Sequence, residues 1–249
     1  MPSVVDPCDT RRTPRIVIAR SPLALTAVAA LLLGASACTT DKGGKEATND
    51  AVADDSTCNE LLGEAGLKWL KERTGGPGKV QLKNTDDLKK ARSLFYQQVE
   101  NWGPEDSGVP TFLDADVCRV RTDVENHKKE LAFRYGPSGL PFGFPFDKAS
   151  TVRPAQTVTA VNSAVKLVHG KDRDGGVSYR VYVKCKIPGT PAKQENDIPI
   201  EGQLTDTLTG DTSARVHLTH LLHSAKVMAD NLDCQNQPVV PAEPPASVK

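Results

Sequence analysis

The sequence lacks most of the signals by which an enzyme or a nucleic-acid-binding protein is recognised. Aromatic residues make up only 5% of its 249 residues, and 31 basic and 31 acidic residues cancel to a formal charge of zero. This balance gives no electrostatic reason to expect nucleic acid as a partner. No two of the six cysteines form a Cys-x-x-Cys pair, which disfavours a zinc ribbon and a thioredoxin-like redox site. We therefore predict no cofactor and no catalytic activity.

An apolar run long enough to cross a bilayer is also missing. The run Leu23–Leu33 has Thr26 as its one polar interruption, and it falls short of the roughly 20 residues that a spanning helix needs. Before it come four arginines, Arg11, Arg12, Arg15 and Arg20, and after it come the small residues 34–37. Because this order of basic, apolar and small residues is typical of a signal peptide, we expect residues 1–37 to be one.

A cysteine follows the small residues directly. The run Ala35-Ser36-Ala37-Cys38 resembles the bacterial lipobox, although Leu is usual where Ala35 stands. The resemblance implies that a lipid is attached to the sulfur of Cys38 and that the chain is cleaved in front of it. The predicted location is the extracytoplasmic face of the cell membrane, with the membrane contacted through the lipid anchor. Simple secretion and an uncleaved membrane span are the alternatives.

The remaining cysteines form an even set. Removal of residues 1–37 takes away four arginines and two aspartates, which leaves 27 basic and 29 acidic residues and a formal charge of −2. Cys8 is lost with the signal peptide and Cys38 carries the lipid, so four cysteines remain for an oxidising compartment. They are Cys58, Cys118, Cys185 and Cys234. We favour the local pairs 58–118 and 185–234 among the three possible pairings.

Composition divides the mature chain into three parts. Residues 38–57 hold the lipidated cysteine and a polar tether with too few large apolar residues to form a core. Residues 58–237 are expected to fold, and one arrangement that we consider is two related halves at about 58–140 and 150–237. Residues 238–249 contain four prolines and are predicted to be an extended, unpacked and disordered tail.

Periodicity within the folded part indicates an α+β fold. Apolar residues recur at helical spacing from a capping box at Thr57 to Gly75-Gly76, and again over 86–102 and 212–232. Strands are predicted at 117–121, 131–135, 157–168 and 177–187, with a hairpin turn at 171–176. We predict a small antiparallel sheet with helices packed on one side, in two disulfide-stapled halves.

Several of these features together resemble a known group of proteins. The chain is similar to lipoproteins of high-GC Gram-positive bacteria, above all Streptomyces, in four features. These are the arginine-rich start, the lipobox, residues 58–62 (Cys-Asn-Glu-Leu-Leu) and residues 231–236 (Asn-Leu-Asp-Cys-Gln-Asn) before a proline tail. The resemblance is one of style and spacing. Because the families concerned are uncharacterised, it implies a location and no activity.

Three histidines repeat at helical spacing in the last predicted helix. His217, His220 and His223 are three residues apart, and imidazoles one turn apart can share zinc or copper. Of the three, His220 and His223 are the candidate metal ligands. The alternative interpretation is a solvated polar face, because the apolar face of this helix centres near Leu218 and Ala225.

A second candidate site is rich in phenylalanine. Phe142, Phe144 and Phe146 lie within five residues of one loop, in a chain with six phenylalanines. Such a loop either plugs the seam between the two halves or presents its rings outward as a contact surface. We expect the plug, since buried phenylalanine is the commoner outcome.

These observations favour a non-catalytic binding or interaction module of the cell envelope. Its ligand, a protein or a small molecule, is not indicated by the sequence. One alternative is a metal-binding lipoprotein that uses the row of His217, His220 and His223. The other is an extracytoplasmic enzyme whose site carries no recognisable motif.

Overall fold

A computed structural model of the chain describes residues 56–75, 80–83, 86–103, 109–122, 129–151, 154–172 and 175–249. All of them belong to the second of two units into which the chain divides, residues 50–249. The predicted signal peptide, Cys38 and nearly all of the predicted tether lie outside the described residues. In the described part of the chain, no helix is long and apolar enough to cross a membrane.

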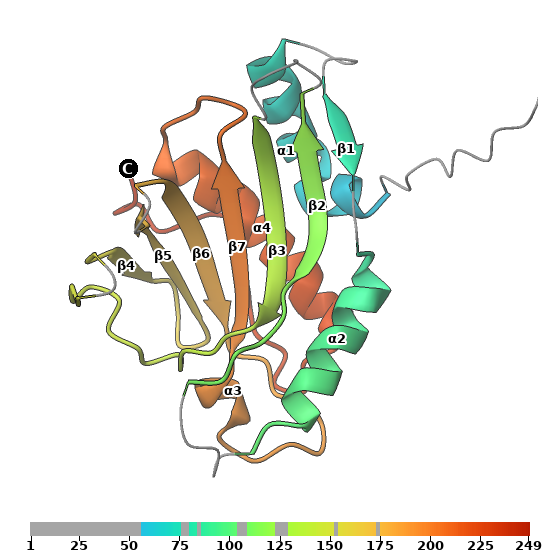
Figure 1. The fold of residues 1–249 in the computed structure, drawn as a ribbon, viewed down its shortest axis with the longest axis vertical. Helices are drawn as coiled ribbons and strands as arrows, with labels where there is room; N and C mark the ends of the chain where they lie inside the picture. The colour runs from blue at the N-terminus through green and yellow to red at the C-terminus, as the bar shows by residue number, and fades with distance from the viewer. Residues whose placement is uncertain are drawn as a thin grey trace, which may run out of the picture. The chain divides into compact units, whose positions relative to one another are not determined.

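Seven antiparallel strands form one sheet in the order β1-β2-β3-β7-β6-β5-β4 (Figure 1). The strands are β1 (Gln81–Lys83), β2 (Ala115–Arg121), β3 (Glu130–Pro137), β4 (Thr157–Ala160), β5 (Val165–Lys171), β6 (Val177–Val183) and β7 (Ile200–Asp206). The last strand in the sequence, β7, lies at the centre and pairs with both β3 and β6. The two proposed halves therefore share a single sheet.

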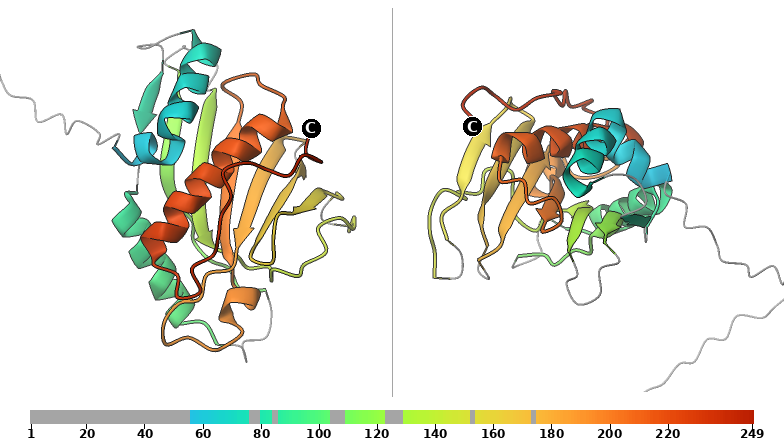
Figure 2. Two further views of the ribbon diagram at one scale, coloured as in Figure 1. Left: turned by 180° about the vertical axis from the view of Figure 1, so that it is seen from behind. Right: turned by 90° about the horizontal axis from the view of Figure 1, so that it is seen from above.

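Three helices lie on one face of this sheet. They are α1 (Ser56–Thr74), α2 (Leu88–Glu100) and α4 (Ala214–Leu232), whereas α3 (Gln194–Asp197) is a single turn. Seen from behind, α4 crosses the sheet diagonally, with α1 and α2 beside it (Figure 2). The α+β class, the antiparallel sheet and the helices on one side are confirmed.

The helices form where the apolar stripes predict them. In α4 the stripe includes Leu218, Leu221, Leu222, Ala225 and Met228, all buried. Ser213 caps this helix by accepting a hydrogen bond from the Val216 amide, and Asp87 caps α2 in the same way. The predicted capping box at Thr57 is wrong, because α1 already begins at Ser56 and Thr57 is buried within its first turn.

Cross-strand pairing defines two faces of the sheet. Phe133, Leu204 and Tyr179 lie opposite one another on β3, β7 and β6, and all three are buried on the helix side. One residue further along each strand, the side chains point to the other face. That row consists of Val158, Val168, Arg180, Gln203, Arg134 and Asp116. We call this second side the open face.

Both predicted disulfides are confirmed. Cys58 in α1 is bonded to Cys118 in β2, with the Cα atoms 4.8 Å apart. Cys185, just after β6, is bonded to Cys234, just after α4, with the Cα atoms 5.0 Å apart. Each bond ties a helix of the covering layer to the sheet, and all four residues are buried.

The structure differs from the sequence prediction in several further places, among them the short edge strand β1, which was not predicted. The predicted strand 157–168 is two strands, β4 and β5, because Asn162 accepts hydrogen bonds from the amides of Ala164 and Val165 and turns the chain. The central strand β7 was not predicted. The proline-rich tail, expected to be unpacked, instead lies along α4 (Figure 2). Val240 and Val248 are buried there, so this expectation was wrong.

A polar anchor explains why the tail is packed. Arg215 of α4 forms an ion pair of 2.8 Å with Glu243 and donates to the backbone oxygens of Pro244 and Pro245. Asn162 donates to the backbone oxygen of Val239. Prolines leave their carbonyl oxygens free to accept, so a proline-rich segment suits an arginine that supplies several donors.

Gly202 in β7 provides a test of the packing between sheet and helix. A Cβ atom on Gly202 would lie 2.2 Å from Cε1 of Tyr135, whose hydroxyl is 2.5 Å from Oγ of Ser224 in α4. Since this bond prevents the ring from moving away, Gly202→Ala should destabilise the fold by about 1–3 kcal/mol. Urea denaturation of the mature chain measures the loss.

The matched control is Gly143→Ala, because no atom lies within 4 Å of a Cβ built at Gly143. This variant should change stability by less than about 0.5 kcal/mol. Equal effects of the two substitutions would contradict the packing described for Tyr135.

Candidate functional site

His217, at the beginning of α4, is fully buried and bonded at both ring nitrogens. Its Nδ1 lies 2.8 Å from the carbonyl oxygen of Ser213, and its Nε2 lies 2.8 Å from Oδ2 of Asp206 at the end of β7. Both partners are acceptors, a carbonyl oxygen and a carboxylate oxygen, so the ring is held between the first turn of α4 and the end of β7. The pair therefore links the central strand to the covering helix.

Asp206 is held ionised by its surroundings. Burial acts to raise the pKa of Asp206, but hydrogen bonds from His217, from the Thr209 hydroxyl and from the backbone amides of Thr209 and Leu208 together lower it. The two amides lie 2.9 Å and 2.7 Å from Oδ1. A carboxylate with this many donors is a stable partner for a buried cation.

Aromatic rings surround the histidines. Tyr179 of β6 stacks on His217 with the ring centres 4.4 Å apart, and Trp69 of α1 meets His217 edge-on at 5.5 Å. The other side of Trp69 stacks on His220 at 4.5 Å. Nε1 of Trp69 donates to Asp211, which also pairs with Arg73. These contacts join α1, α4 and the loop before α4.

His220 is only 7% exposed. Its ring stacks on Trp69, and within the described part of the chain neither of its nitrogens has a hydrogen-bond partner. Burial lowers the pKa of His220 to about 4, and the charges of His217 and His223 add to this while Asp211 opposes it. At neutral pH the ring is therefore uncharged, with one nitrogen that donates and one that accepts.

His223 is exposed and fits against a kink in α1. At Gly63 the backbone leaves the helical conformation, with φ 60° and ψ 179°. Nε2 of His223 donates to the carbonyl oxygen of Glu60 at 3.2 Å. A Cβ on Gly63 would lie 2.5 Å from that nitrogen, so the kink needs glycine both for its positive φ and for space.

The structure alters the interpretation of the histidine row. The solvated-face alternative is wrong for His220, which is buried against Trp69. Among the described residues, no three His, Cys, Asp or Glu side chains lie close enough together to hold a metal ion. His217 already has Ser213 and Asp206 as partners. The metal-binding hypothesis therefore gains no support from this geometry.

A cavity of about 230 Å³ lies beside His220, between α1, α4 and the tail. Its three walls come from α1, α4 and the tail. They consist of Leu62, Gly63, Glu64 and Ala65 in α1, of Thr219, His220, Leu222, His223 and Lys226 in α4, and of Pro241 and Ala242 in the tail. The walls are mostly apolar, and His220 is the buried polar group among them.

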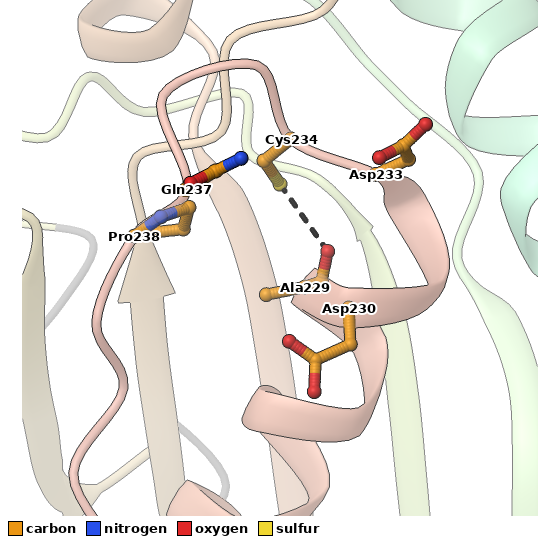
Figure 3. A pocket seen from close by; sticks show the side chains of 6 residues that line it. All are labelled: Ala229, Asp230, Asp233, Cys234, Gln237 and Pro238. Carbon is orange, nitrogen blue, oxygen red and sulfur yellow. Dashed lines mark hydrogen bonds between the residues drawn. The ribbon is translucent and has the colours of Figure 1, made fainter.

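A second cavity, of about 380 Å³, lies at the end of α4 (Figure 3). Its side chains come from α4 and the following turn, where Asp233 and Gln237 have positive φ. The carboxylate of Asp230 is paired with Lys226 at 2.6 Å. The sulfur of Cys234 lies 3.5 Å from the Ala229 carbonyl oxygen, which is a contact only, because a disulfide sulfur has no proton to donate. These features cap the helix.

The phenylalanine loop lies on the open face, over β5 and β6. Phe146 is 2% exposed and forms a small second core with Val168 and Tyr182, against which Phe142 and Phe144 are half-buried. The loop is thus a plug, but it covers the outer surface of these strands instead of a seam between two halves.

Lys166 of β5 holds this loop in place. Its Nζ lies 5.0 Å from the ring centre of Phe142, 4.7 Å from that of Phe146 and 5.1 Å from that of Tyr182. It also donates to the backbone oxygen of Phe142. Burial lowers the pKa of Lys166 to about 8, and Glu201 opposes this shift. Cation–π contacts of this kind stabilise a partly desolvated ammonium.

The rest of the open face is polar. Arg180 pairs with Asp172 at 2.9 Å and with Glu201 at 3.5 Å, while Arg119 pairs with Asp116 and Glu130. A hollow of about 500 Å³ adjoins this network, lined by Arg119, Arg121, Glu130, Asp172, Gly176, Val177, Thr205, Asp206 and Thr207. The face therefore combines both signs of charge in the middle of the sheet.

The sequence pointed to the histidines but not to their partners. Trp69, Asp206 and Asp211 come from three different segments, and no local pattern connects them to α4. One signal was present: Asp206 followed three residues later by Thr209 is typical of a turn in which the carboxylate accepts from nearby amides. That pattern predicts the turn and says nothing about His217.

Comparisons with known proteins identify no relative. No protein-family model, no curated protein and no solved structure matches the chain.

The ion pair of Asp206 and His217 predicts a specific loss of stability. Asp206→Asn removes a buried carboxylate that accepts from His217 and from the amides of Leu208 and Thr209, which should cost about 3–5 kcal/mol. Because the folded pKa of Asp206 is lowered, its contribution is present above the unfolded pKa of about 3.9 and is lost as the pH falls through the folded value. Denaturation of both proteins between pH 7 and pH 2 checks this.

The stability difference between wild type and Asp206→Asn should shrink in the acid range. Glu72→Gln, at an exposed position of α1, is the control and should behave like wild type throughout. A difference that stays constant down to pH 2 would show that Asp206 does not act as an ionised partner.

Proposed function

We propose that the protein is a lipid-anchored, non-catalytic binding module on the extracytoplasmic face of the cell membrane, with the open face of its sheet as the contact surface. One observation carries the contact surface: the three long helices lie on one face of the sheet, and none of them lies on the other (Figures 1 and 2). A covering layer on a single side leaves the other side available to a partner.

The disulfides support an extracytoplasmic location. Both join segments far apart in the sequence, 60 and 49 residues, and both are buried in the helix–sheet interface. Disulfides of this structural kind form and persist in oxidising compartments outside the cytoplasm. The signal peptide and lipobox predicted at residues 1–38 then account for export and anchoring, in keeping with the resemblance to lipoproteins of high-GC Gram-positive bacteria.

The chemistry of the open face suits a protein partner. Arg134, Arg180 and Gln203 provide donors in its central row, and Glu201 and Asp116 provide acceptors beside them. Arginine presents several donors in a planar arrangement and is favoured at interfaces. The half-buried rings of Phe142 and Phe144 add apolar area at the border. A surface with both charge signs and an aromatic rim is complementary to a folded protein of mixed charge.

The anchor is tested by Cys38→Ala. Without the sulfur no lipid can be attached, so the protein should leave the membrane fraction for the medium or accumulate as an uncleaved precursor. Cell fractionation and labelling with a radioactive or clickable fatty acid measure both outcomes. Mature, lipid-labelled protein in the membranes of the mutant would refute the assignment of Cys38. Cys8→Ala, within the predicted signal peptide, is the control and should leave anchoring unchanged.

The contact surface is tested by photo-crosslinking in cells. A photoreactive residue at Gln203, in the middle of the open face, should give a discrete adduct, and the same residue at Gln97, exposed on α2, should not. Adding Arg134→Glu should abolish the adduct, because reversing a charge at the centre of an interface costs several kcal/mol. Adducts at Gln97 alone, or adducts insensitive to Arg134→Glu, would place the contact surface elsewhere.

A further inference from the structure

Strand β4 lies at one edge of the sheet, where β5 is its only neighbour (Figure 1). The Val161 amide, directly after β4, donates to the carbonyl oxygen of Val165, so this pair bonds across the two strands. In an antiparallel pair, every second residue directs its N–H and C=O to the neighbouring strand. Thr159 therefore bonds toward β5, whereas Val158 and Ala160 direct their backbone groups away from it.

The outward backbone groups of Val158 and Ala160 have no hydrogen-bond partner among the described residues. The same outward row ends at Gln156, whose amide already donates to the carbonyl oxygen of Phe146 at 2.9 Å. Three of the four residues of β4 are exposed. Because unused N–H and C=O groups along an edge are a template for a further strand, residues 158–160 form a short docking edge.

This edge lacks the charges that often protect an edge strand from pairing. Charged side chains, lysine above all, keep edge strands of native proteins apart. Residues 154–163 contain no charged residue, whereas β1, at the opposite edge of the sheet, ends at Lys83. Val158 is also 38% exposed. An uncharged edge with an exposed valine can meet an identical edge without repulsion.

We infer that β4 pairs antiparallel with β4 of a second copy of this chain, with Thr159 on a two-fold axis perpendicular to the sheet. In this register Val158 lies opposite the partner's Ala160, and Ala160 lies opposite the partner's Val158. Each of these pairs exchanges two hydrogen bonds, so every outward group is used. A register shifted to place Val158 opposite itself would bring Ala160 against Gln156, whose amide is already bonded to Phe146.

The pairing joins two seven-stranded sheets into one. Because the axis is perpendicular to the sheet, both open faces lie on the same side. Val158 then packs beside the partner's Ala160 on that side, and Thr159 meets the partner's Thr159 on the other, which is a favourable cross-strand pair. A contact of this size makes a weak dimer. It goes beyond the function proposed for the open face, and either can fail without the other.

A charge swap at Thr159 tests the self-pairing by sedimentation of the mature chain without lipid, at concentrations up to about 1 mM. Thr159→Lys and Thr159→Glu each place like charges opposite one another and should weaken the dimer at least about tenfold. An equimolar mixture of the two variants should dimerise again. A wild-type chain that stays monomeric would leave the edge to a strand of another protein and refute the proposal. A mixture that associates no better than either variant alone would refute it as well.

Crosslinking tests the register. Residues on the axis form a non-hydrogen-bonded pair with Cα atoms about 4.5 Å apart, so Thr159→Cys should be joined to its copy by a short bis-maleimide. Gln81→Cys, exposed on the opposite edge strand β1, is the control and should not. Adding Ala160→Pro should abolish the product, because proline removes an outward N–H that the chain's own sheet does not use. Equal crosslinking at both edges, or a product that survives Ala160→Pro, would overturn the proposed pairing.

Discussion

The arrangement of the whole covering layer depends on the buried ion pair between Asp206 and His217. Asp206 ends the central strand, and His217 lies in the first turn of the helix that crosses that strand. Both side chains are almost completely buried, so each polar group depends on the other as its hydrogen-bond partner. The angle at which α4 leaves β7 is therefore fixed at one end, and the disulfide of Cys185 and Cys234 fixes it at the other.

Fixing α4 in this way determines where α1 can lie. Trp69 fits between His217 and His220, and the kink at Gly63 admits His223 one turn further along. The three histidines are thus the contact between two helices, each bonded or stacked on a different partner. Where α1 bends away at the kink, the helices and the tail leave the cavity beside His220.

The sequence predicted what depends on local pattern and missed what depends on distant contacts. Periodicity, turn residues and cysteine positions are local signals. They were enough to predict the three long helices, the β5–β6 hairpin and both disulfides. Strand β7 was missed, although Ile200, Gly202 and Leu204 alternate with polar residues, because a central glycine weakens the pattern. The packed tail and the burial of His220 depend on Arg215 and Trp69, whose effects no spacing rule reveals.

The two faces of the sheet then serve different purposes. On the helix side, charges such as those of Asp206 and His217 are buried in pairs and contribute to a unique packing. On the open face, Arg180 and Glu201 lie 3.5 Å apart and are partly accessible. Lys166 holds the phenylalanine loop against one side of that face through its contacts with Phe142 and Phe146. If the open face is the contact surface that we propose, a partner can bind without rearranging the core, because successive side chains of a strand point to opposite faces of the sheet.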